Sequence, residues 1–151
     1  MISIDPGLRS CGVALWNDST LTSAFLLKGS PKNIGPDAWQ EMRAALIPYS
    51  YQFPHAVIEF PQVYVRSRSK GDPNDLLQIA AIVGGLSALF TNVEVVRPAE
   101  WKGQVPKEVT RARAQARLSA GEISRVSLPT KSLEHNVWDA IGIGLWKIKR
   151  S

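Results

Sequence analysis

The sequence predicts a mixed α/β fold in one domain, and three observations lead to this prediction. First, three short apolar runs near the start of the chain are separated by a Pro-Gly break and a polar break, a pattern typical of an antiparallel meander. Second, two more short apolar runs alternate with segments of helical periodicity. Third, 151 residues suffice for one hydrophobic core. We therefore expect a mixed sheet of five strands flanked by helices, in a single domain over residues 1–151.

The expected strands and helices follow one another in a simple order. The stretch ISIDPGLRSCGVALW reads as two strands around a turn at Pro6 and Gly7, and LTSAFLL reads as a third strand. A helix is expected over DAWQEMRAALI, where Asp37 can cap its start, followed by a short buried strand in HAVIEFP. The segment DPNDLLQIAAIVGGLSALF predicts a long helix that is apolar nearly all round, and VEVVRP predicts the fifth strand. A loop through AEWKGQVP, a basic helix over 107–119, a loop at GEISRVSLPTK and a last helix complete the chain.

The composition is that of a soluble globular protein. Hydrophobic residues make up 44% of the chain and charged residues 21%, and no stretch approaches the roughly 20 unbroken apolar residues that a membrane-spanning helix needs. The first residues, MISIDPG, lack the basic and apolar segments of an export signal. The single cysteine, Cys11, cannot form an internal disulfide, which fits a reducing compartment. We therefore expect a cytoplasmic protein.

Basic residues are concentrated in three segments of the chain. The formal net charge is +5 and the pI is about 9.6. One such cluster would be read as a solvated surface, but three in a chain of this size favour a polyanionic partner such as nucleic acid. The segments are YVRSRSKG with Arg66, Arg68 and Lys70, KEVTRARAQAR with Lys107, Arg111, Arg113 and Arg117, and the terminal KIKR.

Three acidic residues stand in apolar surroundings. Asp5 and Glu59 each come at the end of an apolar strand, and Asp139 lies within an apolar helix. If the fourth strand pairs beside the first, the carboxylates of Asp5 and Glu59 lie side by side, where their repulsion requires a proton or a cation. Asp139 could complete a set of oxygen ligands for Mg²⁺ or Mn²⁺. The alternatives are that Asp5 only forms a turn and that Asp139 lies on a helix surface, whereas Glu59 in a buried strand is harder to explain without a function.

The order of these motifs resembles a known family. A strand-end Asp before Pro-Gly in ISIDPGLRSCGVALW, a strand-end Glu in IEFPQVY, the long apolar helix and the final WDAIGIGLW together resemble the RuvC-like Holliday-junction resolvases of the RNase H-like superfamily, particularly the short forms found in phages. The resemblance covers nearly the whole chain. It implies an RNase H-like fold with three antiparallel strands followed by two parallel ones, and a bacterial host cell as the location if a phage encodes the protein.

Carried over by position, the resemblance implies a catalytic centre that binds two Mg²⁺ or Mn²⁺ ions. Asp5, Glu59 and Asp139 match three of its metal ligands. The family's fourth ligand lies three residues before the last acid, where this sequence has Asn136, while His135 lies four residues before it. Residues three and four apart share a helix face, and imidazole is the better metal ligand. We therefore favour His135 as the fourth ligand, with Asn136 as the alternative.

The resemblance also implies contacts with DNA and with a second subunit. Tyr64 falls where the family has a loop aromatic that stacks on bases, although a packing role is an equal alternative, and Trp101 is expected to be a packing residue. The helix around Leu76–Phe90 resembles the element through which these enzymes form homodimers, with an internal core helix as the alternative. The implied DNA-binding residues are Tyr64, Arg66, Arg68, Lys70, Lys102, Lys107 and Arg111.

The implied activity is hydrolysis of phosphodiester bonds in four-way DNA junctions. Water activated with two divalent ions would cleave the backbone, and a symmetric dimer would make the two matching nicks. Cys11 has no neighbouring base in the sequence, so nothing indicates a covalent intermediate. Three alternatives stay open: another RNase H-like nuclease, such as a ribonuclease H or an enzyme that debranches phage DNA; a non-catalytic junction-binding protein; and an actin-like phosphotransferase lobe, which the chain length disfavours.

Overall fold

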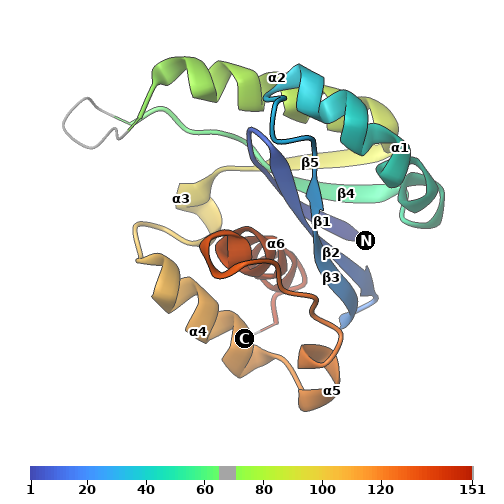
Figure 1. Cartoon of the computed structure of the whole chain (residues 1–151). Helices are drawn as coiled ribbons and strands as arrows, with labels where there is room; N and C mark the ends of the chain where they lie inside the picture. The colour runs from blue at the N-terminus through green and yellow to red at the C-terminus, as the bar shows by residue number, and fades with distance from the viewer. Residues whose placement is uncertain (65–70, 151) are drawn as a thin grey trace.

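The five predicted strands form one mixed sheet in the computed structural model, which describes residues 1–64 and 71–150. The strand order is β3-β2-β1-β4-β5, and helices cover both faces of the sheet (Figure 1). This arrangement confirms the predicted fold class. The strands are β1 (Ile2–Pro6), β2 (Ser10–Asn17), β3 (Thr20–Lys28), β4 (His55–Glu59) and β5 (Asn92–Val96).

The central strand β1 marks the change from antiparallel to parallel pairing. It pairs antiparallel with β2 and parallel with β4, and its Ile4 is level with Ile58 of β4. All five residues of β1 are buried, as expected for a strand that is covered on both faces. Because β1 and β4 run in the same direction, their carboxyl ends meet at the same end of the sheet. Asp5 and Glu59 both lie there, as the sequence predicted.

Helix α1 (Pro36–Gln52) covers one face of the sheet together with α2 (Figure 1). The prediction that Asp37 caps this helix is wrong. Gly35 takes the N-cap position with a φ of 60°, a backbone conformation that favours glycine, and Pro36 follows in the first turn. The helix also continues through Pro48, beyond its predicted end.

Helix α2 (Pro73–Leu89) has one buried side and one exposed apolar side. Asp72 caps its start by accepting a hydrogen bond from the backbone N–H of Asn74 at 2.9 Å. Ile82 and Leu86 are buried in the core between α2, α1 and the sheet. On the opposite side Leu77 is 69% exposed, and the small residues Ala81, Gly84 and Ala88 are exposed as well. In the described part of the chain, no helix has the length and apolar character needed to cross a membrane.

Helix α6 (Glu134–Lys147) lies against the other face of the sheet, over β1 and β2, and α4 (Lys107–Arg117) packs on α6 (Figure 1). Two segments that the sequence predicted as loops contain short helices, α3 (Pro98–Trp101) and α5 (Ala120–Ile123). α5 begins with a capping box, in which Glu122 and Ser119 each accept a hydrogen bond from the other's backbone N–H. α3 has only the glutamate half of this motif, since Glu100 accepts from the backbone N–H of Arg97 at 2.6 Å. A single 3₁₀ turn, η1 (Lys131–Leu133), leads into α6.

Glycines allow α6 to approach the sheet closely. A Cβ atom on Gly12 of β2 would lie 1.9 Å from the backbone oxygen of Asn136, and a Cβ atom on Gly144 would lie 2.3 Å from the Trp16 indole. The Trp16 indole is buried and donates to the Ser3 hydroxyl at 2.9 Å. Both the first turn and the last turns of α6 are therefore held in one position relative to β1 and β2.

A buried glutamate, Glu122, connects β3, α5 and the segment after α6. Glu122 of α5 is 4% exposed and accepts hydrogen bonds from the backbone N–H of Leu21 at 2.9 Å and of Ser119 at 2.8 Å. Its two oxygens also pair with the guanidinium of Arg150, one of them at 2.7 Å. These contacts lower the pKa of Glu122 far below its usual range, chiefly through the hydrogen bonds from Arg150. This carboxylate links β3, α5 and the segment that follows α6.

Candidate active site

Three carboxylates come together from three elements that are far apart in the sequence. Asp5 ends β1, Glu59 ends β4, and Asp139 lies in the second turn of α6. The parallel pairing of β1 with β4 brings the first two together, and the packing of α6 over β1 adds the third. Asp5 is 7% exposed and Asp139 is 6% exposed, so neither is a surface residue.

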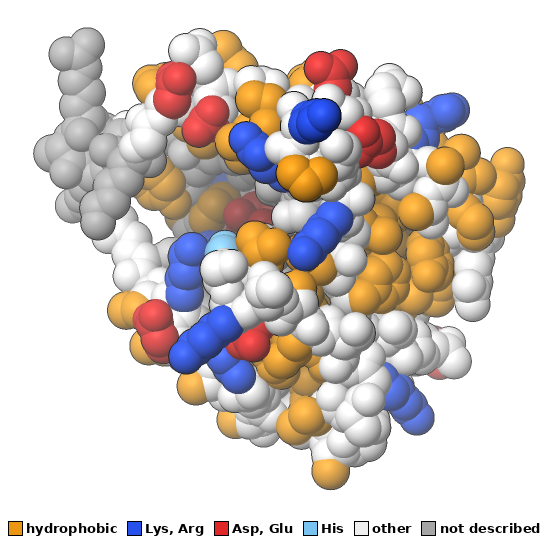
Figure 2. Space-filling model, viewed as in Figure 1, with side chains coloured by type: hydrophobic (Ala, Val, Ile, Leu, Met, Phe, Trp, Pro, Cys, Tyr) orange, Lys and Arg blue, Asp and Glu red, His pale blue; other side chains and the backbone are white. Residues whose placement is uncertain are grey.

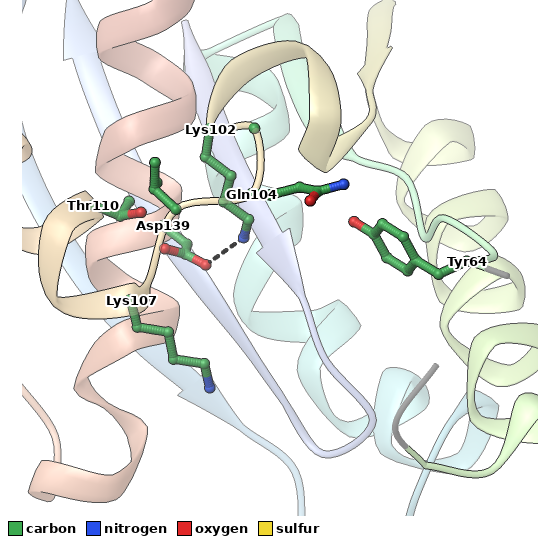
Figure 3. Close-up of a pocket in the computed structure, with 8 residues that line it drawn as sticks. Tyr64, Lys102, Gln104, Lys107, Thr110 and Asp139 are labelled. Atoms are coloured by element: carbon green, nitrogen blue, oxygen red, sulfur yellow. Dashed lines mark hydrogen bonds and ion pairs between the residues drawn. The ribbon is translucent and has the colours of Figure 1, made fainter. Parts of the chain in front are cut away.

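The counter-charge for these acids comes from Lys102, directly after α3. Its ammonium Nζ donates to Asp139 Oδ2 at 2.7 Å (Figure 3). The same Nζ lies 3.4 Å from Glu59 Oε2. A buried carboxylate without such a partner would be strongly destabilising. The family resemblance implied a DNA contact for Lys102, and no pattern in the sequence indicated this ion pair.

Trp101 contacts both Glu59 and Lys102, so it is more than a packing residue. Its indole N–H donates to Glu59 Oε2 at 2.6 Å, and the Lys102 ammonium lies 4.7 Å from the centroid of its ring, a cation–π contact. The ring lies against α6 at Gly142, where a Cβ atom would be 2.5 Å from the indole. The Gly142 position, three residues after Asp139, therefore determines where the tryptophan and its hydrogen bond can lie.

The charges in this cluster shift one another's ionisation. Burial raises the pKa of Asp5 well above its usual range, and the neighbouring charges of Glu59 and Asp139 raise it further. Burial also raises the pKa of Glu59, although Lys102 and the Trp101 hydrogen bond oppose the increase. Burial alone would lower the pKa of Lys102, but the surrounding carboxylates outweigh it and raise that pKa. The site therefore has a strong preference for an added positive charge.

A cavity of about 550 Å³ opens beside the carboxylates and is bordered by basic and aromatic groups. In Figure 2 a hollow opens on this face, with an acidic side chain in its depth and basic side chains beside it. Tyr64 lies across the cavity from Asp139 and points its hydroxyl toward Gln104 (Figure 3). Thr110 also lines it, is 6% exposed, and has a hydroxyl without a hydrogen-bond partner among the described residues. The lining residues are Tyr64, Lys102, Gly103, Gln104, Val105, Lys107, Thr110 and Asp139.

The two candidates for a fourth ligand lie at the start of α6. His135 lines a neighbouring hollow of 350 Å³ together with Lys107. Burial and the charge of Lys107 lower the pKa of His135, while the charge of Asp139 opposes this, so the imidazole favours the neutral form that binds metals. Asn136 is half-buried, and its backbone carbonyl faces Gly12. The preference for His135 over Asn136 stays a prediction.

The predicted DNA-binding residues fall into three groups. Tyr64, Lys102 and Lys107 line the cavity at the carboxylates. Arg111 lines the neighbouring hollow, pairs with Glu134 at 2.8 Å and lies 5.7 Å from the centroid of the Trp138 ring. Arg66, Arg68 and Lys70 lie outside the described residues.

The carboxylates of Asp5, Glu59 and Asp139 are of the chemical type that binds divalent cations. Carboxylate oxygens are the ligands that Mg²⁺ and Mn²⁺ prefer, and three carboxyl groups lie here with Lys102 as the ion-pair partner of two of them and the charge of Lys107 acting on Asp5. Across residues 1–64 and 71–150, however, no three Asp, Glu, His or Cys side chains are arranged to hold one ion together. The donors are of the right kind, and their present positions are those of carboxylates paired with Lys102.

Comparison with solved structures places this arrangement in a known fold. The structure of Thermus thermophilus RuvC in complex with a Holliday junction substrate matches 97% of this chain and 91% of its own, with a TM-score of 0.64. The chain has the RuvC-like fold. A second T. thermophilus RuvC structure matches 97% of this chain and 92% of its own with a TM-score of 0.61, and sequence identity to both is 18%. No protein-family model and no curated protein matches the sequence.

The RuvC-like fold accounts for how the acids converge, whereas the groups around them were not all foreseen. Trp101, Gln104 and Thr110 belong to the site and were not predicted. Trp101 ends, and Lys102 caps, a short helix that was expected to be a loop, so the directions of their side chains could not be inferred. One signal was available: a carboxylate in an apolar helix requires a cationic partner.

Proposed function

We propose that the protein is a metal-dependent, structure-selective DNA endonuclease that resolves four-way junctions by paired symmetric nicks. The observation that carries this proposal is the convergence of Asp5, Glu59 and Asp139 next to a cavity with a basic lining. The RuvC-like fold supports it, since one protein that shares the fold was solved with a Holliday junction substrate.

Asp5, Glu59 and Asp139 would hold the cations, with His135 as the fourth ligand and Asn136 as the alternative. Two Mg²⁺ or Mn²⁺ ions, when bound, would supply the activation of water and the stabilisation of the leaving oxygen. Because Asp5 is central and its pKa is raised, its carboxyl must lose its proton before it can act as a ligand.

The other residues of the cavity would bind and orient the DNA. Lys102 and Lys107 would contact backbone phosphates, and this contact would make binding sensitive to salt. Tyr64 would stack on a base that is exposed at the junction centre, across the cavity from the carboxylates. Burial raises the pKa of the Cys11 thiol to about 12, so this group stays protonated and is no nucleophile.

Two matching nicks require two sites, and we propose that a second copy of the chain provides the other one. The exposed side of α2, with Leu77, Ala81, Gly84 and Ala88, is apolar and offers a contact face for it. Light scattering after gel filtration tests the dimer. Leu77→Arg is expected to give monomers and to uncouple the two nicks, so that single nicks accumulate; a monomeric wild-type protein would contradict this part of the proposal.

The decisive experiment is cleavage of a synthetic four-way junction in Mg²⁺, in Mn²⁺ and in chelator, beside a linear duplex and an RNA–DNA hybrid. We expect paired symmetric nicks in the junction alone and none in chelator. Asp5→Asn and Asp139→Asn are expected to abolish cleavage and retain junction binding, because they remove ligand charge and leave the basic lining intact. Asp37→Asn, on the exposed start of α1, is the matched control and is expected to cleave normally.

Each other outcome points to a different protein. Cleavage of the hybrid, or of branched and linear DNA alike, would indicate a broader RNase H-like nuclease. Tight junction binding without cleavage in either metal would indicate a non-catalytic binder.

A further inference from the structure

We infer that Lys102 is the counter-ion of Glu59 and Asp139, and that a divalent cation must displace it from these two carboxylates in order to bind. The inference rests on the metal dependence proposed above. It assigns Lys102 a role in metal loading that precedes its contact with DNA.

The Lys102 ammonium contacts the carboxylate oxygens that would coordinate a metal ion. Lys102 Nζ lies 2.7 Å from Asp139 Oδ2 and 3.4 Å from Glu59 Oε2, and the same Glu59 oxygen accepts the Trp101 indole N–H at 2.6 Å. An ammonium and a metal ion cannot both lie between these carboxylates.

The charge of Lys102 is smaller than the charge of the carboxylates that it contacts. The Lys102 ammonium balances one unit of charge, while the two carboxylates that it contacts, Glu59 and Asp139, carry two units when they are ionised. A divalent ion balances two units, so it is favoured over Lys102 once it is present at sufficient concentration. Until then the ammonium reduces the repulsion between the two carboxylates.

The displaced Lys102 side chain can move into the neighbouring cavity. Lys102 is the C-cap residue directly after α3 and also lines the cavity of about 550 Å³. Gly103 follows it with a φ of 65°, a conformation in which the chain turns away from the helix. The released ammonium would enter the cavity where we place the scissile phosphate. Metal binding would thus create a phosphate-binding group, and metal and DNA would bind with positive coupling.

The affinity for Mn²⁺, measured by electron paramagnetic resonance of the free ion, tests the competition. Lys102→Gln is expected to bind Mn²⁺ about tenfold or more tightly than the wild type, because a closely paired competing charge is removed. Lys107→Gln is the matched control: it removes a charge from the same cavity, and Lys107 forms no ion pair within the described residues. It is expected to change the affinity about threefold or less, by the difference in long-range charge alone. Lys102→Arg keeps the charge and is expected to stay near the wild type.

A measurement on the wild type guards against a variant that fails to fold. The lysine side-chain NMR signals are recorded in chelator and at saturating Mg²⁺, and Lys102 is assigned by the signal missing from Lys102→Arg. We expect a slowly exchanging ammonium in chelator that loses this protection in Mg²⁺.

An unchanged Lys102 signal, or equal Mn²⁺ affinities of Lys102→Gln and the wild type, would overturn the inference. Junction cleavage combined with either result would leave the proposed function intact. Displacement of Lys102 without junction cleavage would support the inference and refute the proposed function. No binding of Mn²⁺ by the wild type would overturn both.

Discussion

The buried carboxylate of Glu122 gives the sharpest prediction for stability. Glu122→Gln preserves the shape of the side chain but replaces one acceptor oxygen with an NH₂ group. The variant loses the charge that pairs with Arg150 and one of the hydrogen bonds around Ser119. Glu122 is buried and the Arg150 side chain is 27% exposed, so water cannot fully replace the lost partner.

Hydrogen bonds to charged groups contribute about 1.5–3 kcal/mol each, and breaking a buried ion pair at one partner costs about 3–5 kcal/mol. Because Arg150 keeps partial access to water, we take the lower end and expect a loss of about 3 kcal/mol in the free energy of unfolding. For a chain of this size this corresponds to a fall in Tm of about 6–12 °C. Thermal and urea unfolding, monitored by circular dichroism, measure both quantities.

Glu100→Gln is the matched control for this prediction. Glu100 occupies the same capping-box position in α3 but is exposed, and glutamine also functions in a capping box. We expect it to cost less than about 1 kcal/mol. The contacts hold the pKa of Glu122 far below the ordinary value of about 4.3, so its contribution is complete above that value and is lost as the pH falls below it. The difference in the free energy of unfolding between the wild type and Glu122→Gln should therefore become smaller at low pH. A Tm fall equal to that of Glu100→Gln, or a gap independent of pH, would refute the reasoning.

Three further predictions concern the site and the helix that carries Asp139. Trp101→Phe removes the hydrogen bond to Glu59 and should lower the free energy of unfolding, measured with urea in chelator, by about 1.5–3 kcal/mol. Trp146→Phe, at a partly exposed position, is the control and should not show this loss. Gly144→Ala should cost about 1–3 kcal/mol because its Cβ would strike the Trp16 indole, whereas Gly121→Ala, with no contact closer than 4.0 Å, should be neutral; equal Tm values would contradict this. Because folding raises the pKa of Asp5, the metal-free protein should gain stability as the pH falls from that raised pKa toward about 3.9. Asp5→Asn should lack this gain and be more stable than the wild type at neutral pH; unfolding in chelator between pH 4 and pH 8 measures it, and a wild-type protein that only loses stability in this range would contradict it.

Much of the fold and the acidic part of the site could be predicted because they depend on local patterns. The alternation of short apolar runs with helical periods fixed the order of strands and helices, and Asp5 and Glu59 were expected together because both end neighbouring parallel strands. Asp139 was identified because its surroundings in the last helix are apolar.

The cationic part of the site depends on contacts that no local pattern records. Lys102 lies 37 residues before Asp139, and its direction is set by α3, by the Trp101 ring and by the space at Gly142. The sequence predicted a metal ion at Asp139, which stays a prediction, and it did not indicate that the Lys102 ammonium pairs with this carboxylate. The two short helices were also missed, although the Ser-x-x-Glu pattern at Ser119 and Glu122 is a recognisable start signal.

The placement of Asp139 on α6 has a consequence for how the protein is made. Synthesis proceeds from β1 to α6, so Asp5 and Glu59 leave the ribosome long before Asp139 and before the lysine that neutralises it. Until α6 docks on β1 and β2, the nascent chain holds two strand-end carboxylates without their covering helix. A ribosome-bound or truncated chain that lacks α6 therefore has no complete centre, and any nuclease activity of the protein would begin only after the last helix has folded.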